Sequence, residues 1–190
     1  MKKLIAFSSL LLFLMPLSAL MAQAPAGFTA GYIVAADGSR IDGYIKESFK
    51  SKAAVVFQPA SGKKVNYGGN AVNEVNINGV SYITYANDFF KVISTGAKAS
   101  LLQKVSDATG KVIYNGSEAA GISSGTEGRI NDFFVRPAGQ SVPTLINKDN
   151  LNTVAVTLFA DCPALLEKAK AGQMQVTDLE SIIAQFNACK

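Results

Sequence analysis

The sequence predicts an α+β protein, with an antiparallel β-rich domain at residues 23–146 and a short helical tail at residues 147–190. Up to residue 146, short apolar runs with alternating polarity are separated by turn residues, which is typical of antiparallel sheets. Beyond residue 147, the apolar residues recur at helical spacing. Because the first part leaves no room for crossover helices, we expect a roll, a sandwich or a partly open barrel.

Residues 1–22 are predicted to form a cleaved signal peptide. Lys2 and Lys3 precede an uncharged, leucine-rich run, which is followed by Pro16 and several alanines. This is the order of a basic region, a short apolar region and a small-residue cleavage zone. We place the cut after Ala22, which makes Gln23 the first residue of the mature chain. The alternative, an uncleaved membrane anchor, is disfavoured by the proline and the alanines.

The mature protein is therefore expected in the periplasm or outside the cell. No cysteine follows the apolar region, so we expect no lipid at the N-terminus. Most of the apolar runs after the signal peptide are shorter than the roughly ten residues of a membrane-spanning strand. No transmembrane segment is expected in the mature chain.

The composition argues against several classes of function. The chain has no histidine, so mechanisms that use an imidazole as base, nucleophile or metal ligand are closed to it. The formal net charge of +4 falls to +2 without the two lysines of the signal peptide, and the basic residues are scattered. Scattered, nearly balanced charge does not indicate a nucleic-acid partner. We expect that the protein is not an enzyme and that it binds no cofactor and no metal.

The first predicted hairpin is centred on the Asp-Gly pair at residues 37–38. Asp-Gly favours the positive φ angles of a two-residue type I′ turn. Such a loop places Val34 opposite Ile41. It also places Tyr32 opposite Gly43, so that the aromatic ring lies across a position without a side chain.

The second predicted hairpin is centred on the Asn-Gly pair at residues 78–79. The same turn type pairs Ile77 with Val80 and Val75 with Tyr82 on one face of the sheet. Further strands are predicted at residues 53–58, 63–67, 88–93, 99–105, 111–114, 131–136 and 142–146.

The helical tail is predicted to begin with two short amphipathic helices. The first has an apolar stripe over residues 151–159, and we expect Asn147 or Asp149 to cap it. The second begins at Pro163 and stops at Gly172, which are favoured residues for those two positions. Both stripes must be buried against other helices or against the sheet.

A third helix is predicted to start at Thr177, where Glu180 would complete a capping box. Cys162 continues the apolar stripe of the first helix, and Cys189 continues that of the third. In an exported protein, this arrangement favours a Cys162–Cys189 disulfide. The alternative is a pair of buried free thiols. A nucleophilic role for Cys162 is disfavoured because no histidine is present to activate it.

Four segments carry a resemblance to a known group of proteins. They are the Gly-Tyr-Ile hairpin at residues 31–46, the Phe-Phe-Lys-Val-Ile run at residues 89–93, the Asp-Cys-Pro at residues 161–163 and the Phe-Asn-Ala-Cys-Lys at residues 186–190. Together they resemble a widespread set of uncharacterised exported proteins of Bacteroidota. The resemblance implies a β-rich body, a helical tail with the cysteines, and an envelope or secreted location. It implies no catalytic residue.

Residues 115–131 are the first candidate region for function. They are rich in glycine, and a long segment without regular structure is either functional or mobile. We interpret the region as a flexible hairpin tip or linker, with a ligand lid or partner loop as the alternative. The ending of a phosphate-binding loop is missing. The candidate binding residues are Glu118, Ser123, Ser124, Thr126, Glu127 and Arg129.

Two further candidates are weighed against simpler roles. Glu118 and Glu127 could act as the paired acids of a glycosidase, but solvated loop acids are the favoured interpretation. The aromatic residues could form a surface for sugars or lipids, but core packing is favoured. Side chains of the pairs at residues 89–90 and 133–134 point to opposite faces of a strand. Either both faces of the sheet are covered, or an aromatic patch is exposed.

The sequence therefore predicts an exported, non-enzymatic protein that acts by binding or by structural association, with another envelope protein or a hydrophobic ligand as its partner. The first alternative is a carrier that holds a lipid or another hydrophobic small molecule between sheet and helices. The second alternative is a carboxylate-dependent hydrolase.

Overall fold

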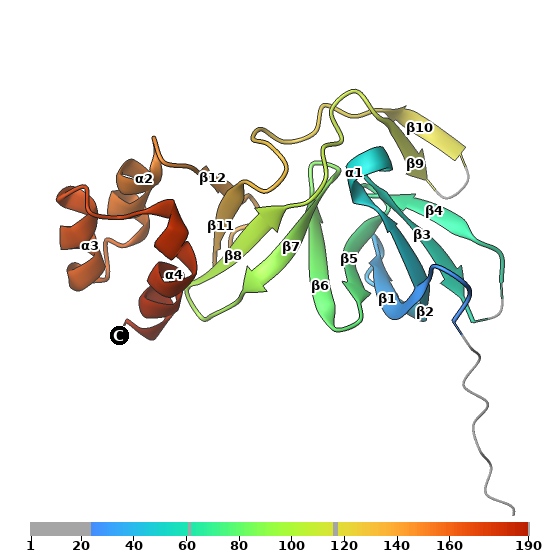
Figure 1. Cartoon of the computed structure of the whole chain (residues 1–190), viewed down its shortest axis with the longest axis horizontal. Coiled ribbons are helices and arrows are strands. Elements are labelled where there is room, and N and C mark those ends of the chain that lie inside the picture. Colours follow the sequence, from blue (N-terminus) through green and yellow to red (C-terminus); the bar gives the residue numbers. More distant parts are fainter. Residues whose placement is uncertain (1–23, 61, 116–117, 190) are drawn as a thin grey trace, which may run out of the picture.

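The computed structural model describes residues 24–60, 62–115 and 118–189. A ten-stranded antiparallel sheet occupies most of this part of the chain. The sheet does not close on itself, and three helices gather at one end of it (Figure 1). The predicted α+β class is confirmed. The predicted signal peptide lies outside the described residues.

The strands of the large sheet are β1 (Thr29–Ala35), β2 (Arg40–Ser48), β3 (Ala54–Pro59), β4 (Val65–Gly68), β5 (Val72–Ile77), β6 (Val80–Tyr85), β7 (Asp88–Ser94), β8 (Ala99–Lys104), β11 (Phe133–Pro137) and β12 (Thr144–Ile146). They lie in the sheet in the order β12-β11-β8-β7-β6-β5-β1-β2-β3-β4. A separate two-stranded arm consists of β9 (Val112–Asn115) and β10 (Glu118–Ile122), and β9 lies beside β4. The helices are α1 (Phe49–Lys52), α2 (Leu151–Leu158), α3 (Pro163–Lys170) and α4 (Leu179–Ala188), with the 3₁₀ turn η1 (Val176–Asp178) before α4.

The first hairpin has a loop of three residues, not two. The N–H of Gly38 donates to the carbonyl of Ala35 at 2.9 Å, and the N–H of Ala35 donates to the carbonyl of Ser39 at 2.9 Å. Gly38 has a φ of +86°. This is a tight turn followed by a left-handed glycine, which adds one residue to the loop.

The longer loop makes the predicted register wrong by one residue. Ile33 pairs with Ile41, and Tyr32 pairs with Asp42 rather than with Gly43. Side chains alternate between the two faces of a sheet, and directly paired residues share a face. If the pairing of β1 with β2 shifted by one residue, the side chains of Ile33 and Ile45 would therefore lie on opposite faces. Ile33 and Ile45 are buried on one face, and the observed register is the one that keeps them there together.

The other predicted strands are confirmed, with boundaries shifted by one to two residues. In the second hairpin, Ile77 pairs with Val80 and Val75 with Tyr82 as predicted. Asn78 and Gly79 have φ values of 51° and 82°, as a type I′ turn requires. Strand β10 was not predicted. The expectation of a long segment without structure of its own is therefore wrong for Glu118–Ile122.

The consecutive phenylalanines Phe89 and Phe90 point to opposite faces of the sheet, and both are buried. Phe89 packs in a cluster with residues of the N-terminal strands, and the centre of its ring lies 4.9 Å from the centre of the Phe49 ring of α1. Phe90 and Phe134 pack together in a cluster on the opposite face. Phe133 packs against a third cluster, which includes the helical tail. At the two aromatic pairs, therefore, both faces of the sheet are covered, and no exposed patch of these phenylalanines is observed.

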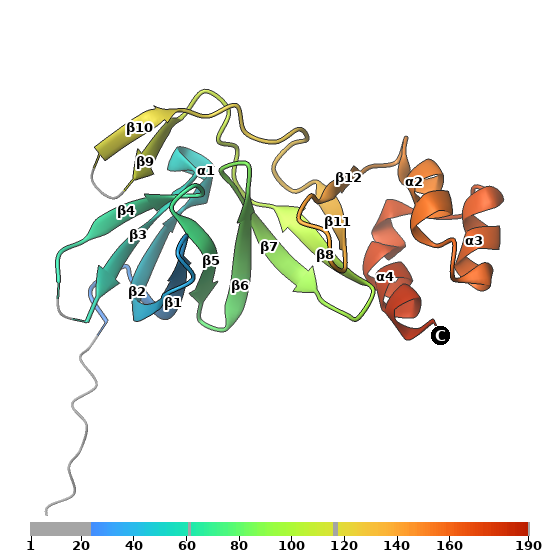
Figure 2. The ribbon, with the colours of Figure 1, turned by 180° about the vertical axis from the view of Figure 1, so that it is seen from behind.

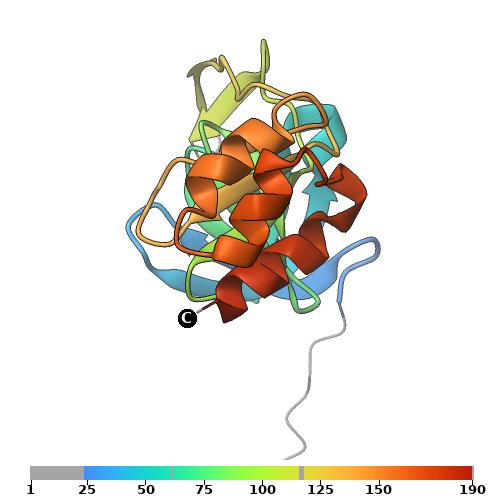
Figure 3. The same cartoon turned by 90° about the vertical axis from the view of Figure 1, so that its left-hand side faces the viewer.

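Helices α2, α3 and α4 stack at the C-terminal end of the sheet, where Figure 3 shows them facing the viewer. The predicted cap of α2 by Asn147 or Asp149 is wrong, because the N-cap residue of α2 is Asn150 and no side chain caps the helix. The side-chain oxygen of Asn147 instead accepts hydrogen bonds from the N–H groups of Asp149 and Asn150 in the turn before α2. Helix α3 begins at Pro163 and is followed by Gly172 at a φ of +66°, as predicted.

The predicted capping box of the third helix is wrong. The 3₁₀ turn η1 precedes α4, and the Thr177 hydroxyl contacts Asp178 Oδ1 instead of capping the helix. The predicted Cys162–Cys189 disulfide is present and links the start of α3 to the end of α4. Among the described residues, no helix has the length and apolarity that crossing a membrane requires.

Candidate functional site

The glycine-rich segment at residues 123–130, called the strap below, is held on the sheet by a buried ion pair. Lys104 Nζ lies 3.1 Å from Asp88 Oδ2, and both side chains are wholly buried. The same ammonium donates to the carbonyls of Thr126, Glu127 and Gly128 at 2.8 to 3.3 Å. Both charged groups lose their contacts with water when they are buried, and the ion pair with its hydrogen bonds compensates for that loss.

The carboxylate of Asp88 has partners on both oxygens. Its Oδ2 also accepts hydrogen bonds from the backbone N–H and the hydroxyl of Thr126, each at 2.7 Å. Its Oδ1 accepts from the hydroxyl of Ser106 and from the N–H of Ala108. With its hydrogen bonds satisfied inside the protein, this pair has a structural role, and we do not assign it to catalysis.

The candidate residues predicted at 115–131 divide into two groups. Ser123 and Thr126 belong to the fold: the Ser123 hydroxyl accepts hydrogen bonds from Asn87 Nδ2 and from the N–H of Gly125. The other candidates, Ser124, Glu118, Glu127 and Arg129, have exposed side chains. Glu118 lies on β10 and Glu127 on the strap, so the two acids are carried by different elements. The strap is attached to the sheet through Lys104 and Asp88, which differs from the flexible hairpin tip or linker that the sequence predicts.

An open groove of about 490 Å³ lies between the end of the sheet and the helical tail. We call it the tail groove. Residues at the ends of β11 and β12, residues of α2 and Phe186 of α4 contribute to its lining. Its lining includes Lys98, Pro137, Thr144, Val154, Leu158 and Phe186.

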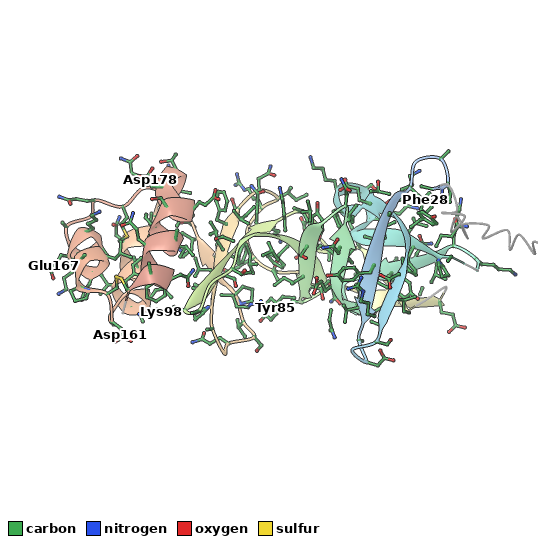
Figure 4. All side chains as sticks on the ribbon, turned by 90° about the horizontal axis from the view of Figure 1, so that it is seen from below. Phe28, Tyr85, Lys98, Asp161, Glu167 and Asp178 are labelled. Atoms are coloured by element: carbon green, nitrogen blue, oxygen red, sulfur yellow. A yellow bond between two sulfur atoms is a disulfide. The ribbon has the colours of Figure 1, made fainter. Side chains whose placement is uncertain are left out.

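The tail groove combines apolar side chains with three threonines, one glutamine and one positive charge. The Lys98 ammonium lies 5.4 Å from the centre of the Phe186 ring, and no carboxylate lines the groove among the described residues. In Figure 4, Lys98 lies beside α4, where the sheet meets the tail. An apolar body with an anionic group matches this lining.

The walls of the tail groove are held by polar contacts across the junction. The side-chain oxygen of Asn187 accepts hydrogen bonds from the N–H groups of Lys98 and Ala99, both at 2.9 Å. Its Nδ2 donates to the carbonyl of Ala99 at 3.0 Å. These bonds hold the end of α4 against the β7–β8 turn. The backbone of Lys98 is therefore fixed before any ligand arrives.

A chain of polar contacts crosses the outer face of the sheet from β2 to β6. The Arg40 guanidinium lies 3.8 Å above the Tyr32 ring and also pairs with Asp42. The Tyr32 hydroxyl donates to Glu74 Oε1 at 2.9 Å, and the Ser81 hydroxyl donates to the same oxygen at 3.1 Å. The hydrogen bond to Glu74 is the main cause that raises the pKa of Tyr32 above its ordinary value, with burial next.

Sequence reasoning did not find the tail groove residues as a group. The stripe of α2 was predicted, so Val154 and Leu158 were expected to be buried against a neighbour. Nothing in the spacing of Lys98 or Pro137 placed them beside α2, because that proximity depends on how the tail packs on β8 and β11. Among the described residues, no group of three or more acidic or cysteine side chains is arranged to hold a metal ion.

Comparison with protein-family models, with curated proteins and with solved structures finds no match to this chain.

Proposed function

We propose that the protein is an exported, non-enzymatic binding protein whose small ligand has an apolar body and an anionic group and lies in the tail groove. The observation that carries this proposal is the lining of the groove, which combines the apolar side chains of Val154, Leu158 and Phe186 with the half-buried Lys98 and, among the described residues, contains no carboxylate. Of the partners that the sequence predicts, the groove favours a hydrophobic ligand held between sheet and helices.

The exported location is supported by two features. The N-terminal sequence has the order of a signal peptide. The Cys162–Cys189 disulfide fits an oxidising compartment such as the periplasm or the medium. The resemblance to exported proteins of Bacteroidota agrees with the same location.

The non-enzymatic character is supported by the absence of histidine and by the positions of the acids. Glu118 and Glu127 are both exposed and lie on different elements. Paired acids in glycosidases need a fixed separation across the substrate. A panel of esters, glycosides and peptides tests this point. Turnover by the mature protein that is lost in Glu118→Gln or Glu127→Gln would contradict it.

Binding is tested by calorimetry with decanoate and with decanol. We expect one decanoate bound per chain, and we expect Lys98→Gln to weaken decanoate binding about tenfold because one ionic contact is lost. Decanol carries no charge, so its binding should be the same in both proteins. Lys168→Gln on α3, an exposed lysine outside the groove, is the matched control and should change neither ligand.

Two outcomes would overturn the proposal. The first is that neither decanoate nor decanol binds the mature protein. The second is that Lys98→Gln binds decanoate as the unaltered protein does, because the anionic end would then lie elsewhere. Native mass spectrometry of the protein purified from its own cell envelope identifies the natural ligand by mass.

A further inference from the structure

Strands β1, β2 and β5 lie side by side in the sheet, well away from the tail helices (Figures 1 and 2). An open hollow of about 560 Å³ lies on their outer face, and we call it the tyrosine hollow. Its volume falls within the range of about 300–1,000 Å³ that is usual for small-molecule sites. Its lining includes Ala30, Tyr32, Arg40, Asp42, Tyr44 and Asn76.

The strand register places these side chains on one face of the sheet. Asp42 and Asn76 lie directly opposite Tyr32 on its two neighbouring strands. In the next row, Tyr44 lies directly opposite Ala30. Directly paired residues share a face, and so do residues two apart on one strand, such as Ala30 and Tyr32. Ala30 is exposed, and its small side chain leaves room beside the two tyrosines.

We infer that the tyrosine hollow binds a neutral carbohydrate. The first argument is the aromatic part of the lining, to which Tyr32 and Tyr44 contribute from adjacent strands. The face of an aromatic ring carries a partial negative charge, and the C–H groups on one face of a sugar ring carry partial positive charges. A sugar ring that stacks on a tyrosine gains this attraction and also removes apolar surface from water.

The charge of the lining gives a second argument. Arg40 and Asp42 form an ion pair with each other, in which Nη2 lies 2.8 Å from Oδ1. Among the described residues that line the hollow, no other carries a charge. The tyrosine hollow therefore has no net charge and does not favour an ion. In this it differs from the tail groove, which has one lysine and no carboxylate in its described lining.

The hydrogen-bonding groups of the lining give a third argument. Arg40 donates to Asp42 Oδ1 from Nε and Nη2, which leaves Arg40 Nη1 and Asp42 Oδ2 without a partner among the described residues. Asn78 is exposed in the β5–β6 turn and also lines the hollow, where its amide adds a donor and an acceptor. A sugar hydroxyl both donates and accepts, so it matches this mixture of groups.

A buried amide lies beside the tyrosine hollow. Gln58 of β3 is directly opposite Tyr44 and therefore shares its face. The side-chain oxygen of Gln58 is buried without a hydrogen-bond partner among the residues that the structure describes. Buried polar atoms without partners are uncommon in folded proteins. After a rotation of the Gln58 side chain, a sugar hydroxyl that extends past Tyr44 would supply the missing donor.

Tyr32 is held in place before any ligand binds. Its hydroxyl donates to Glu74 Oε1 at 2.9 Å, and the Arg40 guanidinium lies 3.8 Å from the centre of its ring. Asn76 is also fixed, because its Nδ2 donates to the Ser81 hydroxyl and its Oδ1 accepts from the N–H of Gly79. Little side-chain freedom is then lost on binding, which favours affinity.

The experiment uses the mature protein with the neutral hexasaccharides maltohexaose, cellohexaose and mannohexaose. Sorbitol, which has hydroxyl groups but no ring, is the matched control ligand. Calorimetry should show binding of at least one hexasaccharide and no binding of sorbitol. Because the ligand is neutral, salt should change the affinity little. The bound saccharide should shift the amide resonances of Ala30, Asp42 and Asn76 in the unaltered protein.

Variants at two positions test the placement of the ligand. Ala30→Leu should weaken binding by more than about tenfold, because a larger side chain at this exposed position fills the hollow. Ala30→Ser keeps a small side chain, so it is the matched control and should bind as the unaltered protein does. Tyr44→Ala should weaken binding about tenfold through the loss of stacking. Tyr32→Phe keeps its ring and should have a smaller effect.

The site is independent of the tail groove, and the same variants show this. Ala30→Leu should leave decanoate binding unchanged, and Lys98→Gln should leave hexasaccharide binding unchanged. Either site can therefore fail its test without the other. The inference is overturned if none of the hexasaccharides binds or if the shifted amides lie outside the tyrosine hollow. It is also overturned if folded Ala30→Leu and Tyr44→Ala both bind as the unaltered protein does.

Discussion

Asp88 and Lys104 face each other from neighbouring strands β7 and β8 as an ion pair with no exposed side-chain surface on either partner. The pair is also the point at which the strap is attached, since Lys104 donates to three of its carbonyls and Asp88 accepts from Thr126. Two elements that are distant in sequence thus depend on one charged contact. This dependence makes the pair the most informative place to perturb the fold.

We expect Lys104→Met to lower the free energy of unfolding by about 3 to 5 kcal/mol, because it leaves the Asp88 carboxylate buried without its cation. Urea denaturation measures the loss. Lys170→Met is the matched control: its ion pair with Glu167 is exposed, so the cost should stay below about 1 kcal/mol. The double variant Asp88→Leu, Lys104→Met should cost less than the two single changes combined. A loss under 1 kcal/mol for Lys104→Met would contradict the structural role.

The disulfide is expected to stabilise the protein by about 3.5 kcal/mol, the loop-closure value for cysteines 27 residues apart. The variant Cys162→Ala, Cys189→Ala should lose that amount in urea denaturation, with the sheet intact by circular dichroism. Titration of thiols in the denatured, unreduced protein gives a direct test. No thiol should react before reduction and two should react after it; two reactive thiols before reduction would refute the bridge.

The contact of Asn187 with the β7–β8 turn requires a glycine at position 96. A Cβ atom at Gly96 would collide with the Asn187 side chain, which makes three hydrogen bonds to Lys98 and Ala99. Asn187→Ala should cost about 2 to 3 kcal/mol, and Gly96→Ala should be destabilising because it displaces the same amide.

The two changes should be strongly coupled, because each removes the same contact. In urea denaturation, Gly96→Ala should cost much less in the Asn187→Ala background than in the unaltered protein. Additive losses would show that the collision is relieved in some other way. Asn187→Asp, which keeps the acceptor oxygen and loses the donor, is expected to fall between the unaltered protein and Asn187→Ala.

Stability should fall at alkaline pH. The hydrogen bond to Glu74 raises the pKa of Tyr32 above 10.0, and burial raises the pKa of Tyr82 above the same value. A group with a raised pKa in the folded state stabilises the protein while it keeps its proton, so this contribution is present below pH 10 and is lost as the pH rises through the folded-state pKa.

Tyrosinate absorbance during a pH titration of the folded protein measures this effect. Tyr32→Phe and Tyr82→Phe should each remove one late-titrating group. Glu74→Gln should lower the pKa of Tyr32, since the carboxylate is its main cause, and should leave the titration of Tyr82 unchanged. An unaltered late phase in Tyr32→Phe would contradict the assignment.

The sequence predicts the local features that short-range chemistry decides. The type I′ turn at Asn78 and Gly79, the start of α3 at Pro163 and the stop at Gly172 all depend on backbone preferences of the residues themselves. Helical periodicity alone predicts that the two cysteines lie on apolar stripes. These predictions needed no knowledge of distant parts of the chain.

The misplaced first hairpin shows where such reasoning stops. Asp37-Gly38 is compatible with a two-residue loop and with a three-residue loop that ends in a left-handed glycine. The choice between them depends on which face of β2 lies with Ile33. That face is set by packing of Ile33 with Val75 of β5 and Ile45 of β2, and β5 follows only after two more strands.

The sequence by itself determined the fold class, the division at residue 147, the second hairpin and the pairing of Cys162 with Cys189, because each rests on periodicity or on the conformational preference of a few neighbouring residues. Only the tertiary structure decided the register of the first hairpin, the attachment of the strap and the tail groove. In each of these, the deciding contact joins residues from separate elements: Ile33 with Val75, Lys104 with the strap, and Lys98 with Asn187 of α4. Burial and charge pairing act on residues that the folded chain brings together, and linear spacing does not contain that information.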